Sequence, residues 1–163
     1  MKLKINIKSQ LKNWNDFFLQ IIILTPLACY SYYKYEIAMV LYPFYVFIFI
    51  QLFFTIYVHV RYYLTNKGQE FVLKSDRIII VQEDKEQIFL VSEIKKIVIC
   101  KSANMDKWGI PYTTFESFRC TRVYLNDGSK FVMTNLLEYD LEKPLHILQG
   151  VKFERRKGFS FFI

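Results

Sequence analysis

The sequence is poor in glycine and cysteine. Five of its 163 residues are Gly, and the first of them is Gly68, so the stretch before it has no glycine at all. The three cysteines, Cys29, Cys100 and Cys120, are odd in number and contain no C-x-x-C pair, which excludes a disulfide framework. Hydrophobic residues make up 53% of the chain, which excludes a disordered protein. The glycine-free residues 1–67 therefore differ in composition from the rest of the chain.

Charge is almost absent from residues 17–60, where only Lys34 and Glu36 carry one. The uncharged segments 17–33 and 37–60 are separated by three residues, which allow only a tight turn. A helix needs about 20 residues to cross a hydrocarbon core of roughly 30 Å, so the second segment spans and the first is at the lower limit. A soluble helix pair would need a polar face that these segments lack. The pattern predicts an antiparallel transmembrane hairpin.

Basic residues flank this hairpin and are scarce at its turn. Lysines precede the first span, and Arg61, Lys67 and Lys74 follow the second, whereas the turn has one Lys and one Glu. The positive-inside rule then predicts a multi-pass protein of the cell inner membrane with both termini in the cytoplasm. Aromatic belts agree, with one set at the outer interface and one at the inner: Tyr30, Tyr32, Tyr33 and Tyr35 outside, Trp14, Tyr62 and Tyr63 inside.

Four polar side chains stand out within the spans. Gln51, Thr55 and His59 recur at i, i+4 and i+8 on one side of the second helix, and Thr25 of the first helix is expected at about the depth of Gln51. Such residues either hydrogen-bond between helices, in one hairpin or between copies, or line a water-filled pore. Both interpretations stay open.

Residues 1–14 precede the hairpin, which we place at 15–64. Apolar and polar side chains alternate over the first eight residues, which is the period of a strand. This strand would pair with an edge of the C-terminal sheet or of a neighbouring copy's sheet. The alternative is a solvated basic tail in which Lys2, Lys4 and Lys8 contact anionic lipid headgroups.

Residues 65–163 alternate short β-type runs with polar turns. The Asp127-Gly128 pair predicts a hairpin turn, because Asp-Gly supplies the positive φ that such turns require. Leucines from Leu136 to Leu148 then fit a helix that ends at Gly150. Strands are expected over 69–74, 77–82, 87–91, 94–101, 118–125 and 130–134. The expected fold is an α+β membrane protein, in which a two-helix transmembrane hairpin precedes a small antiparallel β-barrel or sheet domain with a C-terminal helix.

This order of strands and helix resembles bacterial pleckstrin-homology-like (PH-like) domains, in many of which paired membrane helices precede the domain. The resemblance covers residues 69–150 and implies a binding or scaffolding role without an activity. Inositide binding is not implied, because Arg77 is the only basic residue where the family's phosphoinositide signature has several. The runs that carry the resemblance are RIIIV at 77–81, IFLVSEI at 88–94 and YLNDGSKFVMT at 124–134.

Catalytic and metal-binding patterns are missing from the sequence. Two histidines, His59 and His146, form no cluster with metal-ligand spacing, and no glycine-rich phosphate-binding motif occurs. We therefore expect no enzyme, no catalytic residue, no metal and no cofactor. Residues 68–163 carry fifteen Lys and Arg against thirteen acids, a net charge of +2. That is a weak footprint for nucleic acid, which is not expected as a partner.

One dense basic cluster remains near the end of the chain. Arg155, Arg156 and Lys157 precede the aromatic residues 159–163, a combination that suits an anionic membrane surface or a partner groove. The alternative is a final strand whose charges face water.

The sequence predicts a non-enzymatic integral membrane protein that presents a cytoplasmic PH-like module for self-assembly or partner binding. Its expected partners are membrane lipids, further copies of itself and a cytoplasmic protein of unknown identity. The alternative is a homo-oligomeric membrane pore or effector, for example an accessory of a bacterial antiphage or RNA-guided defence system. Such a pore would permeabilise the inner membrane, with Gln51, Thr55 and His59 facing the lumen.

Overall fold

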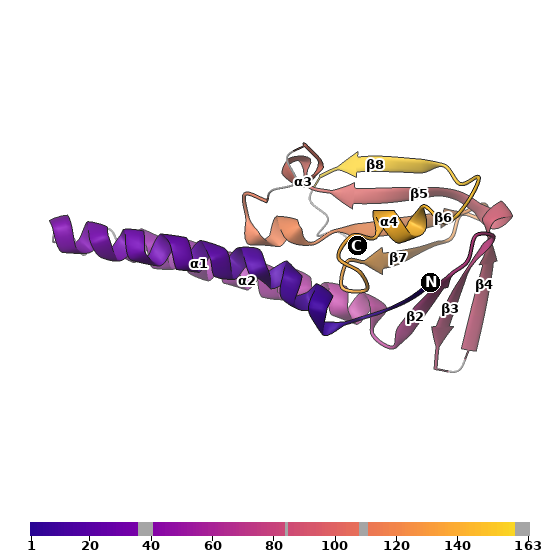
Figure 1. Cartoon of the computed structure of the whole chain (residues 1–163), viewed down its shortest axis with the longest axis horizontal. Coiled ribbons are helices and arrows are strands. Elements are labelled where there is room, and N and C mark those ends of the chain that lie inside the picture. The colour runs from indigo at the N-terminus through magenta and orange to yellow at the C-terminus, as the bar shows by residue number, and fades with distance from the viewer. Residues whose placement is uncertain (36–40, 84, 108–110, 159–163) are drawn as a thin grey trace.

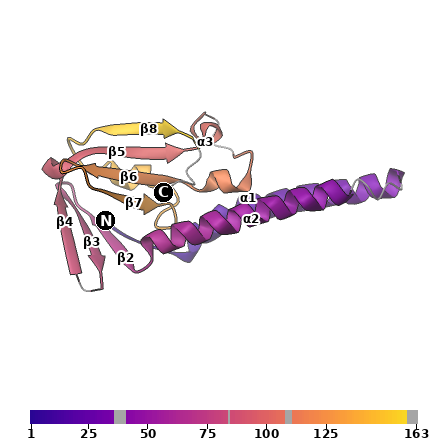
Figure 2. The same cartoon turned by 180° about the vertical axis from the view of Figure 1, so that it is seen from behind.

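The chain folds into a long rod of two helices that carries a β-rich domain at one end (Figure 1). The computed structural model describes residues 1–35, 41–83, 85–107 and 111–158. Figure 2, the view from behind, shows the same arrangement, with both helices side by side and two sheets at one end of the rod. About half of the rod extends beyond the domain in both views.

The rod consists of α1 (Ile7–Tyr35) and α2 (Leu41–Asn66). The Oδ1 atom of Asn6 accepts a hydrogen bond from the Ser9 amide at 2.7 Å, as an N-cap does, and α1 begins directly after it. Within the described ranges, only Leu41–Asn66 is long and apolar enough to cross a membrane. Glu36 of the predicted turn and residues 37–40 of the second predicted span lie outside the described residues.

The first sheet has the strand order β1-β2-β3-β4, with antiparallel neighbours throughout. Its strand β1 pairs with β2 so that Leu3 lies opposite Phe71, and both side chains are buried. Of the two alternatives for the first residues, the chain therefore adopts the strand paired within its own domain. The strands are β1 (Lys2–Lys4), β2 (Gln69–Leu73), β3 (Arg77–Gln82) and β4 (Lys85–Leu90).

The second sheet has the order β7-β6-β5-β8. Strands β5, β6 and β7 are antiparallel neighbours, whereas β8 runs parallel to β5 along the opposite edge. The turn at Gly128, where φ is +87°, joins β6 to β7 as the Asp-Gly pair predicts. The strands are β5 (Ile94–Lys101), β6 (Cys120–Leu125), β7 (Lys130–Thr134) and β8 (Phe153–Lys157).

The predicted C-terminal helix is much shorter than the leucine spacing suggests. Only α4 (Glu142–Leu145) is α-helical in the range 136–148, and turns make up most of the remainder. Pro144 has no amide hydrogen to donate within a continuous helix, which helps to explain the short element. The leucines are nevertheless part of the hydrophobic core, where five of them are buried: Leu136, Leu137, Leu141, Leu145 and Leu148. The other short helices are η2 (Val91–Glu93), α3 (Ala103–Lys107) and η3 (Thr114–Ser117).

Two hydrophobic clusters form the core. The larger one lies between the two sheets and includes Leu3, Phe71, Ile97 and Leu145. The smaller one joins the second sheet to Val58 and Tyr62 from the end of α2. The last turns of α2 therefore belong to the core of the β domain, and the division predicted between residues 64 and 65 does not separate two packing units.

Candidate functional site

The helical rod and the β domain meet along a row of buried polar side chains, which we call the hairpin–domain junction. At its outer end, Gln51 Oε1 accepts hydrogen bonds from the backbone N and the Oγ1 of Thr114, at 3.2 and 3.1 Å. The Thr55 hydroxyl lies 2.5 Å from the Thr114 hydroxyl. The junction comprises Asn13, Asp16, Gln51, Thr55 and Asn66 of the helices, and Thr114, Ser117, Thr134 and Asn135 of the domain.

The middle of the junction ties α1 to the domain. Asp16 accepts a hydrogen bond from the Ser117 hydroxyl. One turn earlier, Asn13 Oδ1 accepts a hydrogen bond of 2.7 Å from Asn135 Nδ2, which also donates to the Ser117 carbonyl at 2.9 Å. Asn13 and Asn135 are both fully buried, and their shared hydrogen bond satisfies Asn13 Oδ1, whereas Asn13 Nδ2 and Asn135 Oδ1 have no partner within the described part of the chain.

The C-terminal end of α2 is fixed to β7 by Asn66. Its Oδ1 accepts a 2.8 Å hydrogen bond from the Thr134 amide, and its Nδ2 donates to the Val132 carbonyl at the same distance. This side chain pairs with the backbone of β7 much as a neighbouring strand would. The helices and the domain are therefore held together from Gln51 to Asn66 of α2 and at Asn13 and Asp16 of α1.

The structure brings part of the predicted polar stripe together. Gln51 and Thr55 are buried against Thr114, while His59 Nδ1 accepts a 3.2 Å hydrogen bond from the Trp14 indole. Thr25 is exposed on α1. In a single chain the two buried stripe residues thus face the β domain, and a pore-lining role for the stripe stays a prediction.

Two aromatic residues expected at the inner membrane interface contact protein instead. Tyr62 is fully buried and packs edge-on against Phe118 with ring centroids 5.5 Å apart. Trp14 lies beside His59. Packing of the rod against the domain accounts for the position of Tyr62, whereas Trp14 is half-buried and Tyr63 is exposed, so an inner aromatic belt stays a prediction. The domain residues of the junction gave no signal in the sequence, because Thr114 and Ser117 lie in a polar loop like any other.

The basic residues singled out in the sequence fall into two places. Lys2 on β1 pairs with Glu70 at 2.6 Å, whereas Lys4 and Lys8 are exposed. On β8, Arg155 and Lys157 pair with acids, and Arg156 is exposed. The terminal cluster is therefore a final strand that retains exposed charge.

A compact ion network surrounds Glu142. Its two carboxylate oxygens accept hydrogen bonds from Lys101 at 2.6 Å and Arg155 at 2.5 Å. Burial alone would raise the pKa of Glu142, but these two cations lower it below its usual value. The network links β5, α4 and β8, so it stabilises the parallel strand pair.

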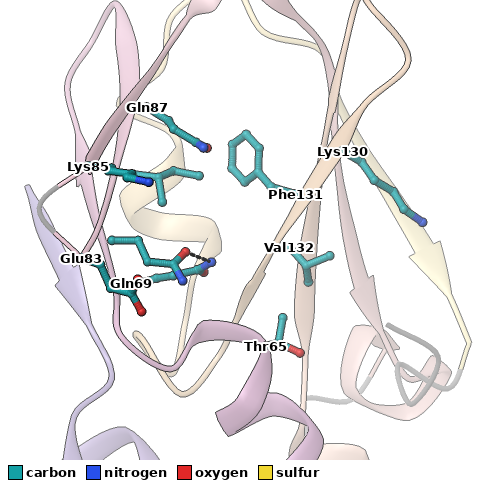
Figure 3. A pocket seen from close by; sticks show the side chains of 10 residues that line it. Thr65, Gln69, Glu83, Lys85, Gln87, Lys130, Phe131 and Val132 are labelled. Carbon is teal, nitrogen blue, oxygen red and sulfur yellow. Dashed lines mark hydrogen bonds between the residues drawn. The ribbon is translucent and has the colours of Figure 1, made fainter.

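A cavity of about 450 Å³ opens between the two sheets beyond the end of α2 (Figure 3). In Figure 3 the side chains of Gln87 and Phe131 point toward each other across it. Gln69 donates a 3.1 Å hydrogen bond to Gln82 on its wall. Ligand pockets for small molecules are predominantly apolar, whereas this lining is mostly polar: Thr65, Gln69, Gln82, Glu83, Lys85, Gln87 and Lys130 beside Ile80, Phe131 and Val132. The lining therefore does not favour an apolar small molecule.

Strand β4 forms one edge of this cavity. In the part of the chain that the structure describes, β4 has a neighbouring strand on one side only. Its apolar residues Ile88 and Leu90 are 49% and 42% exposed. An open edge offers unpaired backbone groups to an added strand, and the flanking Lys85 and Glu86 restrict unspecific pairing.

The fold and these surfaces define an α+β protein with two sheets, a helical rod and a module suited to binding or scaffolding. The chain belongs to the PH domain family, whose model matches residues 4–143. That match includes both helices of the rod as well as seven of the eight strands at least in part. No curated protein and no solved structure matches the chain.

Proposed function

We propose that this chain is a non-enzymatic integral membrane protein that anchors a PH-like module through the α1–α2 hairpin. The observation that carries the proposal is the exposure of large apolar side chains along the free part of the rod. Ile22 and Phe49 are each 67% exposed, and neighbouring positions are similar. Contiguous apolar surface of this kind marks a contact with membrane or protein, and its helical form meets the backbone requirement of a bilayer.

The two helices contribute unequally to this anchor. α2 has the length and composition of a span, and α1 supplies the antiparallel partner whose apolar part begins near Phe17. Insertion as a hairpin leaves both ends of the chain on one side of the membrane. The excess of Lys and Arg at those ends favours the cytoplasmic side of the inner membrane.

The module itself is proposed to bind an extended segment at the β4 edge. The polar cavity lies beside that edge, so a segment added to β4 places alternate side chains over it. The segment comes from a second copy of the chain or from a cytoplasmic protein. Both cases fit a scaffold, in which the hairpin holds the chain in the membrane and the β domain binds the added segment.

Flotation with vesicles tests the anchor. The full chain, co-reconstituted with phospholipid, is expected to float and to resist alkaline carbonate extraction. The double variant Ile22→Lys/Phe49→Lys is expected to lose this association, because a Lys near the centre of a span costs about 2.5–3.5 kcal/mol on insertion. The matched control Ile147→Lys alters a residue of the β domain that is 43% exposed and should float like the parent.

Recovery of the parent chain in the aqueous fraction without detergent would refute the membrane proposal. In that case the apolar rod would be an interface between protein chains. A reporter fused after Ile163 tests the orientation separately and should be active in the cytoplasm.

A further inference from the structure

The part of α1 that the structure describes beyond its contact with the β domain is short for a bilayer. Gln20 Nε2 donates to the Tyr112 carbonyl at 3.4 Å, and Gln51 binds Thr114, so the domain contacts one side of each helix up to these residues. On α1, residues 21–35 remain, fifteen residues in all. At roughly 1.5 Å per residue they reach about 22 Å, whereas the hydrocarbon core is about 30 Å thick.

This shortfall places part of the domain at membrane depth if the turn reaches the far interface. Several polar groups of the domain at this depth are paired within the protein, although the buried Gln20 Oε1 and Thr113 Oγ1 atoms have no hydrogen-bond partner among the residues that the structure describes. Thr114 is bonded to Gln51 and Thr55, and Ser117 is bonded to Asp16. Irregular backbone is tolerated at membrane depth where protein contacts bury it.

The end of the domain that faces the free part of the rod also carries an exposed aromatic side chain. Tyr112 is 68% exposed, beside the point where α1 leaves the domain. Its backbone N donates to Glu116 Oε2 at 3.3 Å, and the same oxygen accepts hydrogen bonds from Ser102 and Asn104. Glu116 therefore fixes the loop that presents Tyr112. Tyr is enriched at membrane–water interfaces because its ring is apolar and its hydroxyl polar.

The same end has an excess of positive charge. Figures 1 and 2 show that α3 and the ends of β5 and β8 lie at the side of the domain toward which the rod projects. Five cations stand there against four acids, a net charge of +1: Lys101, Lys107, Arg155, Arg156 and Lys157 against Asp16, Asp106, Glu116 and Glu142. Basic groups at the cytoplasmic leaflet are attracted by anionic lipids.

We infer that this end of the domain, with Tyr112 at its rim, lies in the headgroup layer of an anionic bilayer. The inference rests on the proposed function and adds a second membrane contact to the hairpin. The PH-like module is then held against the membrane surface, with its β4 edge and polar cavity at the opposite, cytoplasmic end. The orientation of the module relative to the membrane is then fixed.

Site-specific fluorescence in vesicles tests this contact. The full chain with Cys29→Ser carries a single added cysteine, Tyr112→Cys or the control Ser75→Cys, labelled with a polarity-sensitive dye. Ser75 lies at the β2–β3 turn, at the far end of the domain. The Cys29→Ser parent reports background labelling, since Cys100 and Cys120 are buried. The vesicles contain phosphatidylcholine with or without phosphatidylglycerol.

The label at position 112 is expected to be quenched severalfold more by headgroup-nitroxide lipid than the label at position 75, and less by aqueous iodide. Arg156→Gln/Lys157→Gln should reduce headgroup quenching in vesicles with phosphatidylglycerol and leave it unchanged without. Protein that floats but shows equal iodide quenching at both positions overturns this inference and leaves the anchor intact. Protein that fails to float overturns the anchor and the inference together. If Arg156→Gln/Lys157→Gln leaves headgroup quenching unchanged in vesicles with phosphatidylglycerol, the contact with anionic lipid is overturned.

Discussion

Asn13 on α1 and Asn135 after β7 are hydrogen-bonded to each other at 2.7 Å, although 122 positions separate them in the sequence. Both side chains are fully buried. Leaving a buried amide without its partner costs about 1–3 kcal/mol, so each of these residues constrains the other. The pair joins the first helix to the second sheet, and we expect it to couple the rod and the β domain in unfolding.

Replacement of Asn135 by Ala tests this coupling. The change removes the donors to Asn13 and to the Ser117 carbonyl, and we expect the free energy of unfolding to fall by about 1–3 kcal/mol. Urea denaturation in mild detergent, followed by tryptophan fluorescence, measures it. Asn104→Ala, which removes a single hydrogen bond at the partly exposed α3, is the control and should cost less. Equal losses in the two variants would contradict the role of the buried pair.

The hairpin–domain junction shows why the sequence predicts strands better than contacts. Alternating apolar residues and the Asp-Gly pair encode β6, β7 and their turn locally, so these elements lie where they are expected. Thr114, by contrast, is hydrogen-bonded to Gln51, which lies 63 positions earlier in the sequence, and no residue near Thr114 indicates that partner. Gln51 was recognisable as a polar residue in an apolar helix, but its contact depends on how the whole domain folds back.

The C-terminal leucines show a second limit. Their spacing correctly indicates burial, since Leu141, Leu145 and Leu148 all lie in the core. The same spacing does not fix the backbone, because turns also place every third or fourth side chain on one side. Pro144 is a local reason for the break, because it has no amide hydrogen to donate. A final strand at residues 155–157 is one of the two alternatives that the sequence offers, but nothing local indicates its parallel pairing with β5, whose register depends on contacts such as that between Lys96 and Glu154 at 2.8 Å.

Strand β1 gives a prediction for the first residues of the chain. Leu3 is 2% exposed and packs in the inter-sheet core opposite Phe71. We expect Leu3→Ala to lower the free energy of unfolding by about 2–5 kcal/mol, as for other buried leucines. Thermal denaturation of the detergent-solubilised chain measures the loss. Lys4→Ala on the same strand points to solvent and should stay within about 0.5 kcal/mol of the parent. A solvated tail would make the two variants alike.

Glu154 gives a pH-dependent contribution to stability. Hydrogen bonds from Lys152 and Lys96 lower the pKa of its carboxyl to about 2, from an ordinary value of 4.5. Because the folded-state pKa is the lower one, the stabilisation is present above about pH 4.5 and is lost as the pH falls toward about 2. Urea titrations across this interval should show a steeper decline for the parent than for Glu154→Gln. Parallel declines would show that this carboxylate does not contribute.

The turn between β6 and β7 requires a residue with positive φ. Gly128 has φ of +87°, and a Cβ atom there would meet open space, so any cost of substitution comes from the backbone alone. We expect Gly128→Ala to lower the free energy of unfolding by about 1–2 kcal/mol. Gly128→Asn should cost less, because Asn tolerates left-handed backbone better. Chemical denaturation of the three proteins gives the ranking, and an Ala variant as stable as the parent would be inconsistent with the observed turn.

The exposed edge of β4 gives the prediction closest to function. Ile88 is 49% exposed on a strand that has one neighbour, so Ile88→Lys should weaken strand addition by a second copy without loss of core packing. We expect the oligomer mass in detergent to decrease while the midpoint of urea unfolding stays within about 0.5 kcal/mol of the parent. Ile147→Lys, at 43% exposure outside β4, controls for surface hydrophobicity in general. If both variants reduce the oligomer mass equally, or if neither reduces it, self-assembly does not proceed through β4. The rod is then the expected contact, and the same mass measurement with Ile22→Lys tests it.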